Sequence, residues 1–169
     1  MKLRSVDPKT LSPEILGVFD TRFPLLTAGN KTDCNTMTIG WCQLGRLWNT
    51  PVCTVYVRPE RHTYSYMEKS DYFTVSVLPE EMKETLTFCG TKSGRDVDKF
   101  QACGLTLCYG QGDAPFVEEA EWVLVCRKLY VQDLNEDCVV DRNHILPSYG
   151  AKGGWHRAYI GKVVEAYHK

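Results

Sequence analysis

Short runs of β-branched and apolar residues recur along this chain, with turn signals between them. In NTMTIGW and YFTVSVL such residues alternate with others, as in strands that bury one face. PVCTVYV is apolar almost throughout, as in a fully buried strand. These and two later runs predict strands at residues 35–41, 52–57, 72–78, 122–131 and 156–167.

The connections between these runs predict only short helices. Thr63 is expected to cap a helix that ends near Lys69, and residues 80–89 have helical spacing with Gly90 as the C′ residue. Further expectations are a helix start at Ser12-Pro13-Glu14, a turn after Ala28 at Gly29-Asn30, a turn region from Gly45 to Pro51 and a helix over residues 96–102. Strands outnumber helices and no sustained βαβ alternation occurs, so the pattern favours a mainly β fold, a barrel with short helices in its connections.

Length and charge limit the function classes. The 169 residues contain no visible repeat, low-complexity tract or linker, so one domain over residues 1–169 is expected. A net charge of −1 argues against a general binder of nucleic acid or anionic membranes, so any anion site must be local. No run approaches the ~18 apolar residues needed to span a bilayer, and MKLRSVDPKT lacks a signal-peptide core.

The cysteine pattern favours free thiols and a reducing, cytoplasmic location. The count of eight is even, which is compatible with disulfides, but the chain is long enough to need no staples. Cys53 and Cys126 lie inside apolar runs, where a thiol acts as a small hydrophobic side chain. No CxxC motif and no HExxH spacing occurs, so no metal site is expected.

VRPERHT, at residues 57–63, places two arginines where a strand ends and a helix begins. The first N–H groups of a helix have no partners within it, and guanidinium groups match phosphate oxygens. Arg58 and Arg61 therefore predict a phosphate site. The alternative is that they pair on the surface with Glu60, Glu68 or Asp71.

Two further stretches are compatible with a nucleotide-like ligand. In CGTKSGRDVDKF, two glycines punctuate a basic segment, although it is not a Walker A loop; the alternative is a glycine turn between two helices. In NTMTIGW, a glycine-containing strand is suited to close approach by a flat ring. The alternative there is an ordinary strand, with Trp41 and Trp48 in the core or an oligomer interface.

Together these stretches resemble the flavin reductase-like, FMN-binding split-barrel family, particularly its flavoredoxin-like branch. The resemblance rests on N-x-M-T-I-x-W, V-R-P-x-R-x-T, YFTVSVL, G-T-x-S-G-R-D-x-D-K-F, G-L-T at residues 104–106 and Y-I-G-K-V-V at residues 159–164. Their order and spacing cover nearly the whole chain. The resemblance implies a Greek-key split barrel of six to seven strands, a homodimer, and one FMN per subunit near the dimer interface.

The resemblance also implies a set of cofactor-binding residues. The strand would line the isoalloxazine ring, VRPERHT would hold the phosphate and ribityl region, and the basic segment would close over the phosphate. His156, before the last strand, would reach the flavin pocket or the partner subunit. The residues are Asn35, Met37, Thr38, Ile39, Gly40, Trp41, Arg58, Arg61, Thr63, Cys89, Gly90, Ser93, Gly94, Lys99 and His156.

The chain departs from its relatives at one of these positions and at a second position next to Trp41. Many relatives have serine in place of Gly40 and a small residue in place of Cys42. The loss of a hydroxyl near the ring would change the polarity around flavin N5. Cys42 is the thiol whose redox sensitivity we would test first.

Three functions follow from the resemblance. The first is a flavin reductase that transfers reducing equivalents from NADH or NADPH to FMN, or through bound FMN to an acceptor. No Rossmann motif occurs, so the nicotinamide nucleotide would bind transiently. The second is a flavoredoxin-like electron carrier that exchanges electrons with redox protein partners. The third is a module that binds flavin, haem or another planar ligand without turnover.

Overall fold

The structure is a computed structural model that describes residues 2–10, 21–150 and 154–169. The expected helix start at Ser12-Pro13-Glu14 lies outside these residues. Seven antiparallel strands form one continuous path. In path order they are β3 (Cys34–Thr38), β2 (Leu25–Gly29), β6 (Tyr72–Val77), β9 (Trp122–Asp133), β10 (Arg157–His168), β5 (Thr50–Val57) and β4 (Cys42–Leu47).

The five strand predictions are confirmed as β3, β5, β6, β9 and β10, within a mainly β split-barrel fold. β1 (Arg4–Val6) adds an eighth strand beside β10, and β7 (Leu107–Tyr109) and β8 (Pro115–Val117) form a separate two-stranded sheet. The path ends at β3 and β4, which follow each other in the chain but do not pair. The split of the barrel therefore lies between them, at residues 39–41.

The turn expected from Gly45 to Pro51 is present, but its predicted bounds are too wide. β4 continues to Leu47 and β5 begins at Thr50, so only Trp48 and Asn49 form the turn. Both have positive φ, at 48° and 58°, as the two central residues of a tight hairpin turn require. A bulky residue such as Trp48 seldom adopts this backbone, so the sequence did not show that the turn consists of these two residues alone.

Short helices connect the strands, as expected. They are α2 (His62–Lys69), α3 (Lys83–Thr91), α4 (Lys99–Cys103) and α5 (Arg142–Ile145), with 3-10 turns η1 (Pro8–Thr10), η2 (Glu80–Met82), η3 (Gln111–Asp113), η4 (Glu136–Cys138) and η5 (Leu146–Ser148). The predicted helix at residues 96–102 begins instead at Lys99, because the Asp98 carboxylate accepts from the backbone N–H groups of Phe100 and Gln101. No helix in the described residues is long and apolar enough to cross a membrane.

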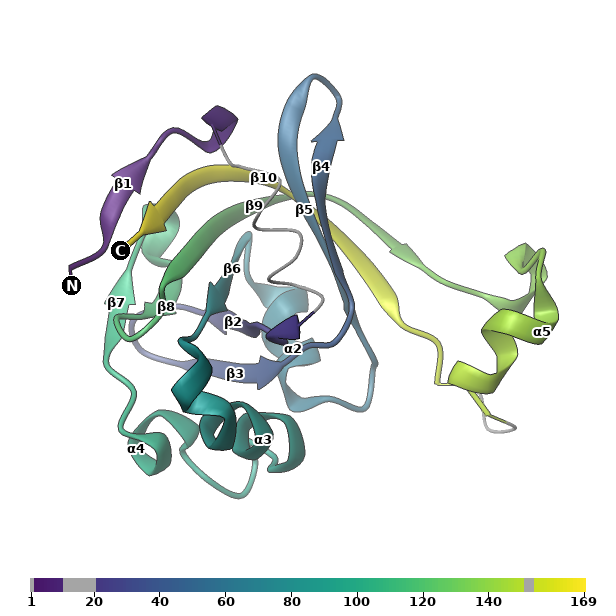
Figure 1. Ribbon diagram of the computed structural model, residues 1–169. Coiled ribbons are helices and arrows are strands. Elements are labelled where there is room, and N and C mark those ends of the chain that lie inside the picture. The colour runs from purple at the N-terminus through teal and green to yellow at the C-terminus, as the bar shows by residue number, and fades with distance from the viewer. Residues whose placement is uncertain (1, 11–20, 151–153) are drawn as a thin grey trace.

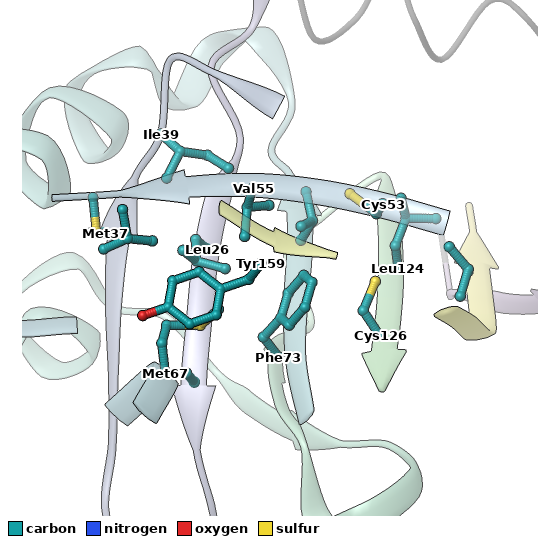
Figure 2. Close-up of a cluster of buried hydrophobic side chains, with 14 of the residues drawn as sticks. Leu26, Met37, Ile39, Cys53, Val55, Met67, Phe73, Leu124, Cys126 and Tyr159 are labelled. Carbon is teal, nitrogen blue, oxygen red and sulfur yellow. The ribbon is translucent and has the colours of Figure 1, made fainter. Parts of the chain in front are cut away.

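The barrel encloses an apolar core, part of which Figure 2 shows. Leu26, Phe73 and Tyr159 are fully buried in it. Cys53 and Cys126 are buried there as well, as their apolar runs predicted, and all eight cysteines are free thiols. A second cluster lies between the barrel and helices α3 and α4, and includes Cys89.

One segment leaves the barrel, and we call its described residues, 134–150 and 154–156, the arm. β9 and β10 run outward past the other strands, and the arm joins their outer ends and contains α5 (Figure 1). A network fixes the base of the arm to α2. Arg157 donates to Glu68 at 2.8 Å and to Asp133 at 2.6 Å, and the buried Tyr159 hydroxyl donates to Glu68 at 2.6 Å.

Candidate functional site

Residues 39–41 carry the chain across the split of the barrel. The predicted strand at 35–41 ends at Thr38, and Ile39 points into the core with 3% of its surface exposed. Trp41 is 42% exposed. A Cβ at Gly40 would make only ordinary contact with the Phe23 ring, at 3.8 Å. Met37 also lies in the core, so this stretch presents backbone and the Trp41 side chain to a ligand.

Asn35 joins β3 to the start of α2. Its Nδ2 donates to the Thr63 hydroxyl at 2.8 Å, and Thr63 is buried. The expected role of Thr63 as helix cap is therefore wrong, because Arg61 is the N-cap residue and Asn35 occupies the threonine hydroxyl. Gly94 lies against the other side of the amide, where a Cβ would come within 2.0 Å of Asn35 Oδ1. Only glycine fits this close approach.

Arg61 lies between α2 and the end of α3. Its Nη2 donates to the Gly90 carbonyl at 3.0 Å, and burial lowers the pKa of the guanidinium. No carboxylate within the described residues forms an ion pair with it. A half-buried cation without an anionic partner is costly, so a bound anion would relieve this cost.

Arg58 points toward the arm. It donates to the Ser148 carbonyl at 2.9 Å and lies 3.9 Å from the Glu60 carboxylate, so the expected surface pair with Glu60 is present but long. Of the other two predicted surface partners, Glu68 is bound by Arg157 instead, and Asp71 forms no ion pair with either arginine among the described residues. The two arginines of VRPERHT thus have different surroundings, and Arg61 has the less neutralised charge.

The N-terminus of helix α2, which carries the positive end of the helix dipole, lies beside Arg61. No side chain caps its first turn, whereas the Lys128 ammonium donates to the Met67 and Glu68 carbonyls at its last turn. A helix N-terminus without a cap favours anions. Arg95 belongs to the predicted basic segment but not to the predicted cofactor-binding residues, and it adds a cation at the rim by donating to the Glu60 carbonyl at 3.5 Å.

Lys99 is buried rather than open to a ligand. Only 3% of its surface is exposed, and its ammonium donates to the Thr36 carbonyl at 2.9 Å and the Cys89 carbonyl at 2.8 Å. Burial lowers its pKa, and the nearby Arg61 charge adds to this effect. Lys99 thus connects β3 to α3. The third N–H group of its ammonium takes part in neither of these two bonds.

Gly90 and Ser93 border this cation group. The expectation that Gly90 ends the helix is wrong, because α3 runs to Thr91. A Cβ at Gly90 would lie 3.4 Å from the Thr38 Cβ, so glycine permits the close packing of α3 on β3. Ser93 Oγ accepts from the Arg95 backbone N–H at 3.2 Å, which turns the loop after α3.

A second group of predicted residues lies at the arm, where aromatic rings surround Trp41. The Trp41 and His156 ring centroids are 4.6 Å apart, and Tyr149 stacks on Trp155 at 3.9 Å. His156 Nδ1 lies 3.3 Å from the Tyr149 hydroxyl, and Arg58 lies over the Tyr149 ring at 5.6 Å. Burial, with a smaller contribution from the charge of Arg58, lowers the pKa of His156 to about 4.

A cavity of about 990 Å³ opens beside this aromatic group, between the start of β4 and the arm. Its lining includes Gly40, Trp41, Cys42, Tyr56, Tyr149 and Trp155. Of these, Tyr56, Tyr149 and Trp155 were not predicted. The aromatic residues of SYGAKGGWH, just before the last strand, were the only sequence signal for two of them.

The structure therefore assembles the predicted residues into two adjoining parts. Asn35, Arg61, Thr63, Cys89, Gly90, Gly94 and Lys99 are linked through the bonds around α2 and α3, with Ser93 at their border. Trp41, Arg58 and His156 meet at the arm, beside Gly40. Such an arrangement suits an elongated ligand with an anionic end and a flat end.

Comparison with known proteins gives a family and a set of similar folds. The flavin reductase like domain matches residues 16–169. A flavoredoxin from Methanosarcina acetivorans is 23% identical with a TM-score of 0.70, covering 88% of this chain and 68% of that chain. An FMN-binding protein from Thermus thermophilus with bound p-hydroxybenzaldehyde is 21% identical with a TM-score of 0.68, covering 86% and 70%.

A third similar structure is nitrilotriacetate monooxygenase component B from Mycobacterium thermoresistibile. It is 18% identical with a TM-score of 0.67, covering 92% of this chain and 73% of that chain. At such identities the likeness of these structures shows the fold alone. A search of curated proteins gave no match.

Proposed function

The chain belongs to the flavin reductase-like domain family, and we propose that it is a flavoprotein that binds FMN. FMN held by these residues would supply the chemistry for moving reducing equivalents from NADH or NADPH, either to FMN that is then released or through bound FMN to a further acceptor. The protein supplies binding and orientation. The similar folds that include a flavoredoxin and an FMN-binding protein support the choice of flavin.

The observation that carries the proposal is the unpaired positive charge at Arg61. Its guanidinium stands beside the uncapped end of α2, with Arg95 at the rim and the buried Lys99 behind. A phosphate monoester carries up to two negative charges and three acceptor oxygens. Charge-assisted hydrogen bonds contribute about 1.5–3 kcal/mol each, so this group of cations fits the FMN phosphate.

The flat end of the cofactor fits the split of the barrel. Gly40 has no side chain to keep a ring away from the backbone, and among the described residues only the Phe23 ring lies near its Cβ position. We place the isoalloxazine ring against residues 39–41, with Trp41 and His156 at its border. These side chains would fix the ring's orientation and exclude water from one side of it.

Arg61→Ala tests the phosphate assignment. FMN affinity, measured by titration of the apoprotein with fluorescence detection, should fall about 10- to 100-fold, the equivalent of one charge-assisted bond. Arg142→Ala is the matched control, because Arg142 is an exposed arginine of the arm that pairs with Glu136. Circular dichroism checks that both variants fold. Equal FMN affinity in Arg61→Ala and the parent chain would refute the assignment.

An electron carrier is the second candidate, favoured by the structural similarity to a flavoredoxin. The two candidates differ in their electron donor. A reductase oxidises NADH or NADPH in steady state, with or without added FMN. A carrier is reduced only by a ferredoxin-like protein. A purified protein that is colourless and takes up no FMN would exclude both, and would leave a module for another planar ligand.

We also propose that the protein is a homodimer. Five apolar side chains on the β4–β5 hairpin and β9 are 38–56% exposed: Leu47, Trp48, Leu129, Tyr130 and Val131. Trp48 keeps a costly positive φ and meets the Tyr130 ring at 6.0 Å. Exposed apolar residues of this kind suit a partner subunit. The eight free thiols support a reducing, cytoplasmic setting.

A further inference from the structure

The cavity of about 990 Å³ at the arm lies on the outer face of the sheet. Tyr56 of β5 and Gln132 of β9 both line it, and both pair with Ala158 of β10. Residues paired in this way share one face of a sheet. Tyr159, the next residue of β10, is buried in the barrel core, so the face that carries Tyr56 and Gln132 is turned away from the core.

Aromatic rings form the wall of this cavity beside residues 39–41. Trp41 meets Tyr149 edge-on, with ring centroids 6.0 Å apart, and Tyr149 stacks on Trp155 at 3.9 Å. Trp41 and Trp155 both keep part of their surface exposed. Flat apolar walls of this kind bind a planar molecule by burying the faces of its ring. The arm adds further apolar side chains to the lining, from Leu134, Val139, Val140 and Ile145.

Two glutamine side chains of the lining, Gln43 and Gln132, supply hydrogen-bond donors. The Tyr56 hydroxyl donates to the Gln43 carbonyl oxygen at 3.1 Å, and the Tyr130 hydroxyl donates to the Gln132 carbonyl oxygen at 3.1 Å. A primary amide also has two N–H donors. Because both carbonyl oxygens already accept a hydrogen bond, the two amides have their N–H groups to offer to a ligand with acceptor oxygens.

The carboxylates of the lining already have partners. Asp133 accepts from Arg157 through both of its oxygens, at 2.6 and 2.8 Å, and Asp141 caps α5 by accepting from the His144 backbone N–H. The described residues of the lining include no lysine or arginine. A phosphate or carboxylate would lose hydration in this cavity without gaining a cation. The lining therefore favours an uncharged ligand.

We propose that this cavity binds an uncharged planar aromatic molecule with carbonyl oxygens, a quinone, as the electron acceptor of the flavoprotein. Its ring would pack against Trp41 and Trp155, and its oxygens would accept from the amides of Gln43 and Gln132. The quinone takes up the two electrons and two protons that reduced FMN loses on returning to oxidised FMN, and it leaves as the hydroquinone. This acceptor role rests on the proposed function, whereas the binding of the quinone does not.

The first test measures binding of duroquinone, whose fully methylated ring resists addition of thiols. Saturation-transfer NMR of its methyl protons is recorded with the full chain, with and without saturating FMN. We expect binding in both states. Duroquinone that is displaced by FMN would occupy the flavin position instead of the cavity, and no binding at all would mean that the cavity takes no quinone; either result would overturn the proposal.

The preference for an uncharged ligand is tested with a matched pair of compounds. Methyl 4-acetylbenzoate and 4-acetylbenzoate share a ring and a ketone and differ by one negative charge. The ester should bind at least about 10-fold more tightly, because the acid would be buried without a cation. Equal affinity of the two compounds would show a site for anions and would overturn the proposal.

Two variants locate the site. Gln43→Glu replaces an exposed amide donor by a carboxylate of the same shape and should weaken duroquinone binding about 10-fold. Gln101→Glu, at an exposed position on α4, is the matched control and should leave this binding unchanged. Trp155→Ala removes part of the wall and should also weaken it, with circular dichroism to check folding. Parent-like duroquinone affinity in both cavity variants would refute the site.

The acceptor role is tested separately. The chain is loaded with FMN, reduced with stoichiometric dithionite and mixed with duroquinone or ferricyanide without oxygen, while the flavin absorbance is followed. Gln43→Glu should slow reoxidation by duroquinone more than reoxidation by ferricyanide. Bound duroquinone that is not reduced would refute the acceptor role. Duroquinone binding to a chain that takes up no FMN would refute the proposed function and keep the site, whereas FMN binding without duroquinone binding would do the reverse.

Discussion

His156 is an imidazole held between Trp41 and the Tyr149 hydroxyl at the base of the arm. Its pKa is lowered from 6.5 to about 4, chiefly by burial. Between these values the unfolded chain binds a proton that the native chain does not. The stability that this neutral histidine contributes is therefore complete above pH 6.5 and is lost as the pH falls toward 4.

His156→Gln isolates this contribution. The difference in unfolding free energy between the parent chain and the variant, measured by urea denaturation, should shrink as the pH is lowered from 7 to 4. His144→Gln, at an exposed position on α5, is the control for the loss of an imidazole elsewhere in the arm. Parallel pH profiles for the parent chain and His156→Gln would mean that the imidazole titrates normally.

At the scale of elements, β10 depends on one glycine where it crosses the core. A Cβ at Gly161 would lie 2.7 Å from the Phe73 ring and 2.8 Å from the Cys126 Cβ. Overpacking of this kind costs about 1–3 kcal/mol. Gly161→Ala should lower the unfolding free energy by that amount, measured by chemical denaturation.

Gly45→Ala provides the matched control for β10. Gly45 is an exposed glycine in strand β4 of the same sheet, and no described residue lies within 4 Å of its Cβ position. Alanine there should change the unfolding free energy by less than about 0.5 kcal/mol. If both variants lost stability equally, the loss would not be due to the Phe73 contact.

The elements that the sequence predicted correctly are those whose secondary structure is determined by their own residues. β5 and β6 are buried strands, and their apolar β-branched residues identify them without reference to the rest of the chain. The errors occur where a contact with a residue distant in the sequence determines the local structure. Thr63 has the chemistry of a cap, but its hydroxyl is bonded to Asn35, which is 28 positions away.

Gly90 and the hairpin turn illustrate the same limit. Gly90 looked like a helix end, yet its lack of a side chain serves the contact of α3 with Thr38. Trp48 has no turn propensity, so its role in the hairpin turn depends on contacts beyond the turn, such as that with Tyr130. For the candidate site, the sequence identified the charged and glycine positions. It could not show that Lys99 is buried, or that Tyr149 meets the Trp41 ring and stacks on Trp155.

For the whole molecule, the arm and the hairpin are the parts that a single barrel does not explain. Figure 1 shows β9 and β10 leaving the barrel toward the arm, and the β4–β5 hairpin projecting beyond the other strands. Val140 on the arm is 99% exposed, and Trp48 on the hairpin is 56% exposed. Both features place apolar side chains in solvent unless a second subunit covers them.

Tyr130→Glu tests whether β9 forms that subunit contact. Tyr130 is 45% exposed and lies against Trp48. A single chain should therefore fold with a polar group at this position. In a dimer that covers Tyr130, the new carboxylate would be buried without a partner, which costs several kcal/mol. The mass in solution, measured by light scattering, should change from two chains to one.

Gln101→Glu on α4 is the control for this test, because it adds the same charge to an exposed residue on a different side of the barrel. It should leave the mass at two chains. FMN titration of Tyr130→Glu then separates two arrangements of the site. If a partner subunit completes the pocket beside Trp41, affinity falls together with the dimer; if Arg61 and residues 39–41 of one chain suffice, the monomer retains its FMN. A parent chain with the mass of one chain would refute the dimer itself.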